Sequence, residues 1–175
     1  MNDNLVPVPG KILVSEEEIR SIVIKLGAQI SADYAGKKLH LLGILRGAVP
    51  FMWDLSQYLR LDVTFDFMSV NKTKEGQVRI IKDLDTPLDG LDILLVEDIV
   101  NEGTTLKYIL DSLSLRDPKS IRVCTMFERP DKHKEKIKLD YVGKAIDNRY
   151  AVGYGLDYEQ MYRNLPYLAE LSFCK

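Results

Sequence analysis

The sequence predicts an α/β fold with a central parallel β-sheet, because helical and strand-like hydrophobic patterns alternate along the chain. The chain has 175 residues, of which 46% are hydrophobic, so it is long enough to bury the core of one ordinary domain. It contains no internal repeat, low-complexity segment or linker that would divide it. We therefore expect a single domain spanning residues 1–175.

The first part of the chain contains two expected helices and two expected strands. Ser15 and Glu18 form a capping box, and apolar residues then recur at helical spacing, so a first helix should end near Tyr34. Residues 39–45 indicate a buried strand, and residues 61–69 indicate a second one. Between them, Pro50 suits the first turn of a second helix that ends near residue 59.

The second part continues the alternation, with strands expected at residues 93–96, 121–127 and 150–154 and a helix at 105–115. Two other stretches depart from it. Residues 71–90 include the short β-prone run VRII, and we expect a mobile hairpin there, because long insertions between strands are commonly functional. Residues 129–138 are basic, and a solvated connection is their simplest interpretation.

Charge and hydropathy narrow the classes of partner. The formal net charge is only −2, so no strong overall field favours nucleic acid or an anionic membrane. No apolar run approaches the roughly 20 residues of a membrane span, and the first residues lack the pattern of a secretion signal. We expect a cytoplasmic protein with neither nucleic acid nor membrane as partner.

The segment ILLVEDIVNEGTTLKYIL, residues 93–110, is the most informative part of the chain. An apolar strand leads into Glu97 and Asp98, then into a glycine turn at Gly103 that opens a helix. Such a turn exposes backbone N–H groups, and the helix dipole adds partial positive charge, so a phosphate can bind there. The two acids suit ribose hydroxyls or a divalent cation. The segment therefore predicts a sugar-phosphate site.

Other charged residues follow the predicted strands and gather at the same edge of a parallel sheet. Arg46 follows the first strand, Lys138 the fourth and Asp157 the fifth. Separated carboxylates suit Mg²⁺, which binds through one or two protein carboxylates plus substrate oxygens. The G-x-x-x-x-G-K-[ST] and complete dinucleotide fingerprints are absent, which argues against a nucleoside triphosphatase or a dehydrogenase.

Several segments carry a resemblance to a known family. The run VEDIVNEGTTL resembles the phosphoribosyl-diphosphate (PRPP) motif of type I phosphoribosyltransferases. Six further segments resemble the bacterial hypoxanthine (hypoxanthine-guanine) phosphoribosyltransferases of that family: GILRGAVPFMWDL, FDFM, IIKDLD, SLRDPKSIRVCT, LDYVG and AVGYGLDYEQMYRNLPYL. They occur in family order from about Ser15 to Leu171, so the resemblance covers nearly the whole chain.

The resemblance implies the type I phosphoribosyltransferase fold, with helices flanking the sheet, a small hood formed by the N-terminal and C-terminal segments, and a mobile hairpin at about residues 70–90. It implies purine salvage, in which N9 of hypoxanthine or guanine displaces pyrophosphate from PRPP and forms IMP or GMP. It also implies Mg²⁺ as cofactor and a homodimer or homotetramer.

The resemblance further implies roles for individual residues. Asn101, Lys138 and Arg163 would act in catalysis, Lys138 by donating to the purine O6 and Arg163 by binding pyrophosphate. A cis peptide bond would precede Arg46 in the pyrophosphate turn. PRPP would contact two loops, formed by Leu45, Arg46, Gly47, Glu97, Asp98, Glu102, Gly103, Thr104 and Thr105. The purine would contact Lys138, Tyr150, Ala151, Val152 and Asp157, and Mg²⁺ would contact Glu97, Asp98 and Asp157.

Three positions depart from the family pattern. Asn101 stands where an aspartate usually takes the proton from purine N7, and an amide cannot take that proton at neutral pH. Glu102 replaces a small hydroxyl residue and would repel the 5′-phosphate unless it points to solvent or meets a cation. Lys72 and Lys74 lie where the family presents Ser-Tyr, so they could contact pyrophosphate instead.

These departures leave two functions open, an active transferase slowed by Asn101, or a protein of this fold that binds PRPP or nucleotide for regulation with little turnover. Simpler roles also remain open for single residues. Lys138 could be a surface lysine, Tyr150 could pack in the core, and Asp157 and Arg163 could form a surface ion pair. Asp66 is expected to pair within the sheet rather than to act in catalysis.

Overall fold

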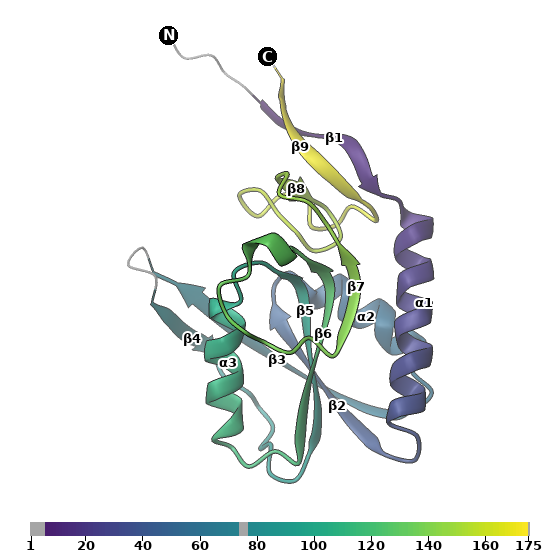
Figure 1. The fold of residues 1–175 in the computed structure, drawn as a ribbon, viewed down its shortest axis with the longest axis vertical. Coiled ribbons are helices and arrows are strands. Elements are labelled where there is room, and N and C mark those ends of the chain that lie inside the picture. The colour runs from purple at the N-terminus through teal and green to yellow at the C-terminus, as the bar shows by residue number, and fades with distance from the viewer. Residues whose placement is uncertain (1–5, 74–76, 175) are drawn as a thin grey trace.

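The computed structural model describes residues 6–73 and 77–174, which form two β-sheets and three α-helices. The larger sheet has six strands in the order β4-β3-β2-β5-β6-β7, and the smaller has three in the order β1-β9-β8. Figure 1 shows the smaller sheet at the top of the view, above the larger one. The phosphoribosyltransferase-like architecture expected from the sequence is therefore a large sheet with a small sheet at one end.

The larger sheet is parallel except at one edge. Its strands are β2 (Lys38–Leu45), β3 (Asp62–Lys72), β4 (Val78–Lys82), β5 (Asp92–Val100), β6 (Ser120–Glu128) and β7 (Tyr141–Ala145). Strand β4 pairs antiparallel with β3, whereas the other neighbours pair in parallel. The prediction of a central parallel sheet is confirmed, and the added antiparallel strand comes from the predicted hairpin.

Helices cover both faces of this sheet. Helices α1 (Glu16–Asp33) and α2 (Ala48–Gln57) share one apolar cluster with β2 and β5, while α3 (Thr104–Ser114) belongs to a second cluster on the opposite face. The amide of Glu18 donates to Ser15 Oγ over 3.2 Å, which confirms the predicted cap of the first helix. A short 3₁₀ helix, η1, spans Pro130–Lys132. Within the described ranges, none of the helices combines the length and apolarity needed to cross a membrane.

The expected fifth strand of the main sheet is wrong. Residues 150–154 contribute only β8 (Ala151–Val152), which pairs with β9 (Leu168–Cys174) in the smaller sheet, and β9 pairs in turn with β1 (Val6–Val14). The strand that completes the main sheet is β7. It is a short edge strand whose side chains are mostly half-buried, so it lacks the continuous apolar run that marks a buried parallel strand.

The predicted hairpin forms around β3 and β4 and is fastened at its base by Asp66. The Asp66 carboxylate accepts hydrogen bonds from the amides of Asp85 and Thr86, each 2.9 Å long, and lies 3.7 Å from Lys82 Nζ. Asp66 is 4% exposed, so this interaction is buried. Asp66 pairs within the sheet, as expected. The predicted contact of Lys74 lies outside the described residues.

Candidate active site

The first component of the site is the turn between β2 and α2. The peptide bond from Leu45 to Arg46 is cis, as the sequence resemblance implied. Gly47 follows, and a Cβ atom added there would lie 1.6 Å from Asp98 Oδ2. Only glycine therefore fits between this turn and the end of β5, which fixes the backbone of the turn against the acidic residues.

Those acidic residues, Glu97 and Asp98, are consecutive on β5 and therefore point to opposite sides of the strand. Glu97 lines a cavity of about 430 Å³, and Asp98 lines a second cavity of about 220 Å³. Burial raises the pKa of Glu97 well above its usual range, and the neighbouring Asp98 raises it further. Burial also raises the pKa of Asp98 to about 6. The pair is a concentration of negative charge without enough neutralising cations.

The larger cavity is bounded by the loop that opens α3. Gly103 has a φ of 82°, in the left-handed region, and α3 begins at Thr104 without a side-chain cap. Its first amides therefore lack intrahelical acceptors and can donate to an anion. The carbonyl of Glu102 accepts the amides of Lys134 and Glu135 over 3.0 and 3.3 Å. This loop is thus tied to the basic segment after β6.

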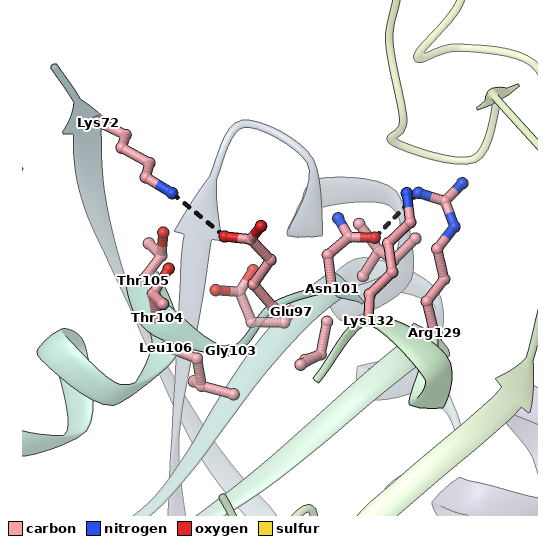
Figure 2. Close-up of a pocket in the computed structure, with 12 residues that line it drawn as sticks. Lys72, Glu97, Asn101, Gly103, Thr104, Thr105, Leu106, Arg129 and Lys132 are labelled. Atoms are coloured by element: carbon pink, nitrogen blue, oxygen red, sulfur yellow. Dashed lines mark hydrogen bonds and ion pairs between the residues drawn. The ribbon is translucent and has the colours of Figure 1, made fainter. Parts of the chain in front are cut away.

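The side chain of Glu102 is partly exposed and meets two cations. Its carboxylate lies 2.5 Å from Lys134 Nζ and 3.5 Å from Lys72 Nζ, so it joins the basic loop to the end of β3. Figure 2 shows Lys72 reaching across the cavity toward this carboxylate. The hydrogen bond from Lys134 lowers the pKa of Glu102. Both lysines therefore form ion pairs with the carboxylate of Glu102.

Arg129 is the cation at the junction of the two cavities, and it lines both. It directly follows β6, and its guanidinium donates to the carbonyls of Asp147 and Arg149 over 3.0 and 2.7 Å. A third hydrogen bond, 2.9 Å long, runs from Arg129 Nη1 to Asn101 Oδ1 (Figure 2). The sequence interpretation missed Arg129, although its position immediately after a parallel strand was a usable signal.

Lys138 does not occupy the place that the sequence interpretation gave it. Its side chain is 84% exposed, lies 2.5 Å from Asp140, and lines neither cavity. Lys138 is well removed in sequence from the end of β6, and the intervening loop carries it away from the carboxyl edge of the sheet. The predicted contact of Lys138 with a purine is therefore corrected, and its interpretation as a surface lysine fits the structure.

The smaller cavity is bounded on one side by residues in β8 and on either side of it in sequence. Ala151 and Val152 are buried in that strand, whereas Tyr150 is 58% exposed, so Tyr150 does not pack in the core. Asp157 and Arg163 form an ion pair with a 2.7 Å separation. Both side chains are about three-quarters buried, so the pair is less exposed than the surface pair considered from sequence. Asp157 lines the smaller cavity, so the pair lies at the edge of that cavity.

A residue without any sequence signal, Gln160, connects this segment to the turn between β2 and α2. Its Oε1 accepts from Arg46 over 2.9 Å and from Arg163 over 3.1 Å. The backbones also touch, because a Cβ atom added to Gly155 would lie 2.0 Å from the carbonyl oxygen of Gly47. The segment after β8 therefore rests directly on the turn after β2.

The carboxylates are compatible with Mg²⁺ bound together with a substrate. Among residues 6–73 and 77–174 no cluster of three or more side chains could hold a metal without substrate. A cation that keeps water and substrate oxygens needs only one or two protein carboxylates. The raised pKa values of Glu97 and Asp98 reflect burial without adequate positive charge, which a divalent cation would supply.

Comparison with known proteins identifies the family to which this site belongs. The family model described as "Phosphoribosyl transferase domain" matches residues 11–159. The chain belongs to this family. Its curated relatives include hypoxanthine-guanine phosphoribosyltransferases from Streptococcus agalactiae, at 44% identity, and Bacillus subtilis, at 43% identity, with each alignment covering 93% of both chains.

Solved structures agree with the sequence relatives. A hypoxanthine-guanine phosphoribosyltransferase from Bacillus anthracis superposes with a TM-score of 0.92 at 34% identity, covering 95% of this chain and 99% of that one. A hypoxanthine phosphoribosyltransferase from Staphylococcus aureus gives 0.91 at 41% identity, covering 94% and 92%. The family, the fold and the enzyme class predicted from the sequence, a transferase, are confirmed.

Proposed function

We propose that this phosphoribosyltransferase makes IMP, and also GMP, together with pyrophosphate, from PRPP and hypoxanthine or guanine in purine salvage. The observation that carries the proposal is the position of Glu97 and Asp98 between two cavities. One cavity ends at the helix N-terminus of the phosphate loop, and the other ends at Tyr150 and Asp157. A phosphorylated ribose and a planar base fit these two ends, with the acids at the ribose between them.

The chain's own groups account for the binding of PRPP. The amides at the start of α3 and the hydroxyl of Thr105 bind the 5′-phosphate, while the turn at Leu45, Arg46 and Gly47, with Arg163, binds pyrophosphate. Glu97 and Asp98 accept from the ribose hydroxyls. Mg²⁺ would be held by one or two carboxylates at a time together with substrate oxygens, at the ribose by Glu97 or Asp98 and in the smaller cavity by Asp157, and would neutralise charge on the departing pyrophosphate.

The purine lies in the smaller cavity, where Tyr150 stacks on the ring and the backbone near Val152 and Asp157 contacts its edge. Arg129 replaces Lys138 as the group that donates to O6. Three of its five N–H groups bond to the protein, which leaves two for a ligand. Donors at this place favour a 6-oxopurine over adenine, whose 6-amino group is itself a donor.

Catalysis follows from positioning and charge. The buried acids and the fixed turn hold the reacting atoms of PRPP and base together and stabilise positive charge that develops on the ribose. Asn101 supplies no general base, and such a base is typically worth about 10²–10⁴-fold in rate. The enzyme therefore works slowly. As part of this proposal, it acts as a homodimer or homotetramer.

A second function remains in view because of Asn101 and Glu102. A member of this fold that binds PRPP or a nucleotide for regulation, with little turnover, would tolerate both residues. The intact pyrophosphate turn and the cation at Arg129 favour the enzyme, since a binding protein does not need to position both the leaving group and the base.

The test is steady-state formation of IMP from hypoxanthine, PRPP and Mg²⁺ by the wild-type chain and by Asn101→Asp. We expect low, measurable activity that rises about 100-fold when the carboxylate is introduced. Gln29→Glu, the same chemical change on the exposed side of α1, is the matched control and leaves the rate unchanged. Absence of activity in all variants would favour the regulatory binding protein, and equal rates would refute the role given to position 101.

A further inference from the structure

The orientation of the Asn101 amide is determined by its neighbour. Arg129 Nη1 lies 2.9 Å from Asn101 Oδ1. A guanidinium carries only donors, so the amide nitrogen cannot take the place of the oxygen in this contact. Arg129 is itself held by the carbonyls of Asp147 and Arg149, and cannot follow Asn101 into another position without losing these bonds. The amide oxygen is therefore directed at Arg129.

The amide nitrogen of Asn101 is a hydrogen-bond donor. Figure 2 shows the amide nitrogen of Asn101 on the side away from Arg129. Both Asn101 and Arg129 line the smaller cavity as well as the larger one. Both residues therefore lie at the junction of the two cavities, where a ligand can meet N–H groups of Arg129 and of the Asn101 amide. An aspartate at this position would accept a hydrogen bond from purine N7–H, whereas the amide nitrogen of Asn101 would donate one to N7.

We propose, on the basis of the proposed function, that Asn101 and Arg129 form a donor pair that selects purines whose N7 is an unprotonated acceptor. The O6 and N7 atoms lie on the same edge of a 6-oxopurine, and both are acceptors when N7 carries no proton. The donor pair matches that edge. It opposes the N7–H form, whose proton would face the N–H groups of Asn101 and Arg129.

The selected form determines where the reacting proton goes. A neutral base bound in this way carries its proton on N9. That proton leaves to water, and the electron pair of the N9–H bond forms the new bond between N9 and C1 of the ribose. The bond from C1 to the pyrophosphate oxygen breaks, and its electron pair departs with pyrophosphate. The protein binds the product nucleotide, in which N7 is always an acceptor, in the same way. Asn101 acts here as a specificity-determining residue.

The test compares two nucleotides that differ in this one property. IMP has an acceptor at N7, whereas 9-deaza-IMP has a carbon at position 9 and a permanent N7–H donor. Calorimetric titration measures the affinity of each without any turnover. We expect the wild-type chain to bind IMP at least about 10-fold more tightly than 9-deaza-IMP, because the mismatch leaves buried donors unpaired.

Two variants separate the donor pair from general effects on binding. Asn101→Asp keeps an oxygen for Arg129 and replaces the donor arm by an acceptor, so the preference for IMP reverses. Arg129→Met releases the amide, so the ratio of the two affinities moves toward one even if both affinities fall. Equal binding of the two nucleotides by the wild-type chain, or tighter binding of 9-deaza-IMP, would overturn this inference alone. Failure to bind either nucleotide would overturn the proposed function as well.

Discussion

The floor of the site and its rim are built by different means. The floor consists of the turn at Gly47 and the acids Glu97 and Asp98, and Gly47 lies so close to Asp98 that a Cβ atom would not fit between them. The rim consists of Asn101, Glu102 and Arg129, whose side chains are held by hydrogen bonds and ion pairs with loops. The floor therefore depends on backbone shape, and the rim depends on which side chains are present.

This difference separates the shared chemistry of the family from what is particular to this chain. The expected cis peptide bond and acidic pair are found in the floor, whereas two departures from the expected family pattern, Asn101 and Glu102, lie in the rim. A rim residue can be replaced when a neighbouring side chain pairs with the new group, as Lys134 and Lys72 form ion pairs with Glu102. A floor residue has no such freedom.

The largest effect is expected from a change to the floor. Gly47→Ala forces the turn away from Asp98, and a misplacement of about 1 Å at a reacting centre can cost about 100-fold in rate. We expect kcat/KM for IMP formation to fall by at least about that factor. Gly36→Ala is the control. Gly36 has a positive φ, but a Cβ atom added there would meet no other atom within 4 Å. That variant loses about 1 kcal/mol of stability and keeps its activity, and a Gly47→Ala enzyme of normal activity would refute the packing argument.

The next largest effect is expected from a change to Arg129, the cation of the rim. Arg129→Met removes the donors at the junction of the cavities, so kcat/KM for hypoxanthine should fall about 30-fold, within the range for loss of a buried charged donor. Lys138→Met, on the exposed side chain beside Asp140, should change it by less than about 2-fold. Steady-state kinetics with hypoxanthine measure kcat/KM for both variants. A larger loss in Lys138→Met than in Arg129→Met would show that Lys138, and not Arg129, contacts the base.

A third prediction concerns the stability of the floor. The pKa of Asp98 is about 6 in the folded protein, against an ordinary value of 3.8, so the folded state binds more protons between these pH values. The free energy of unfolding therefore falls as pH rises from about 4 to about 6 and stays low above that. Asp98→Asn should stabilise the ligand-free protein by about 2 kcal/mol at pH 8 and very little at pH 4.

Urea unfolding at the two pH values measures this difference. Asp62→Asn, at the exposed start of β3, is the control for the loss of one negative charge. If Asp98→Asn stabilises the protein equally at both pH values, the gain does not come from the buried charge.

The smallest effect is expected at Glu102. Glu102→Thr removes a negative charge next to the phosphate loop and frees Lys72 and Lys134, so KM for PRPP should fall about 3-fold at low salt. Because the group is partly exposed, the change should fade as ionic strength rises. Glu135→Thr, on the adjacent loop, should leave KM unchanged. A higher KM in Glu102→Thr would mean that Glu102 organises the lysines for the ligand.

The floor could be predicted from the sequence because its signals are local. A buried strand, two acids and a glycine turn at a helix start occur within one short segment, and the carboxyl ends of parallel strands bring the Arg46 turn beside them. Hydrophobic patterns also give most elements of the main sheet. The edge strand β7 was missed because its half-buried residues do not produce such a pattern.

The rim could not be predicted to the same extent because it depends on loop paths. Arg129 and Lys138 both belong to the basic segment after β6, and only the path of that segment shows which one enters the site. Gln160 gave no signal, since its position depends on successive positive φ angles at Glu159 and Gln160, a conformation that non-glycine residues seldom adopt. Tertiary structure decides these contacts.

The contact between Gly155 and Gly47 connects the two ends of the site. The segment that bounds the smaller cavity rests on the turn expected to hold pyrophosphate, with no side chain between the two glycines. With the ligands placed as in the proposed function, a purine that shifts this segment should also shift the turn, and we expect the affinity for one ligand to depend on whether the other is bound. Linkage makes this dependence equal in both directions. Under the proposed function, we therefore expect the contact between these glycines to couple the binding of base and pyrophosphate.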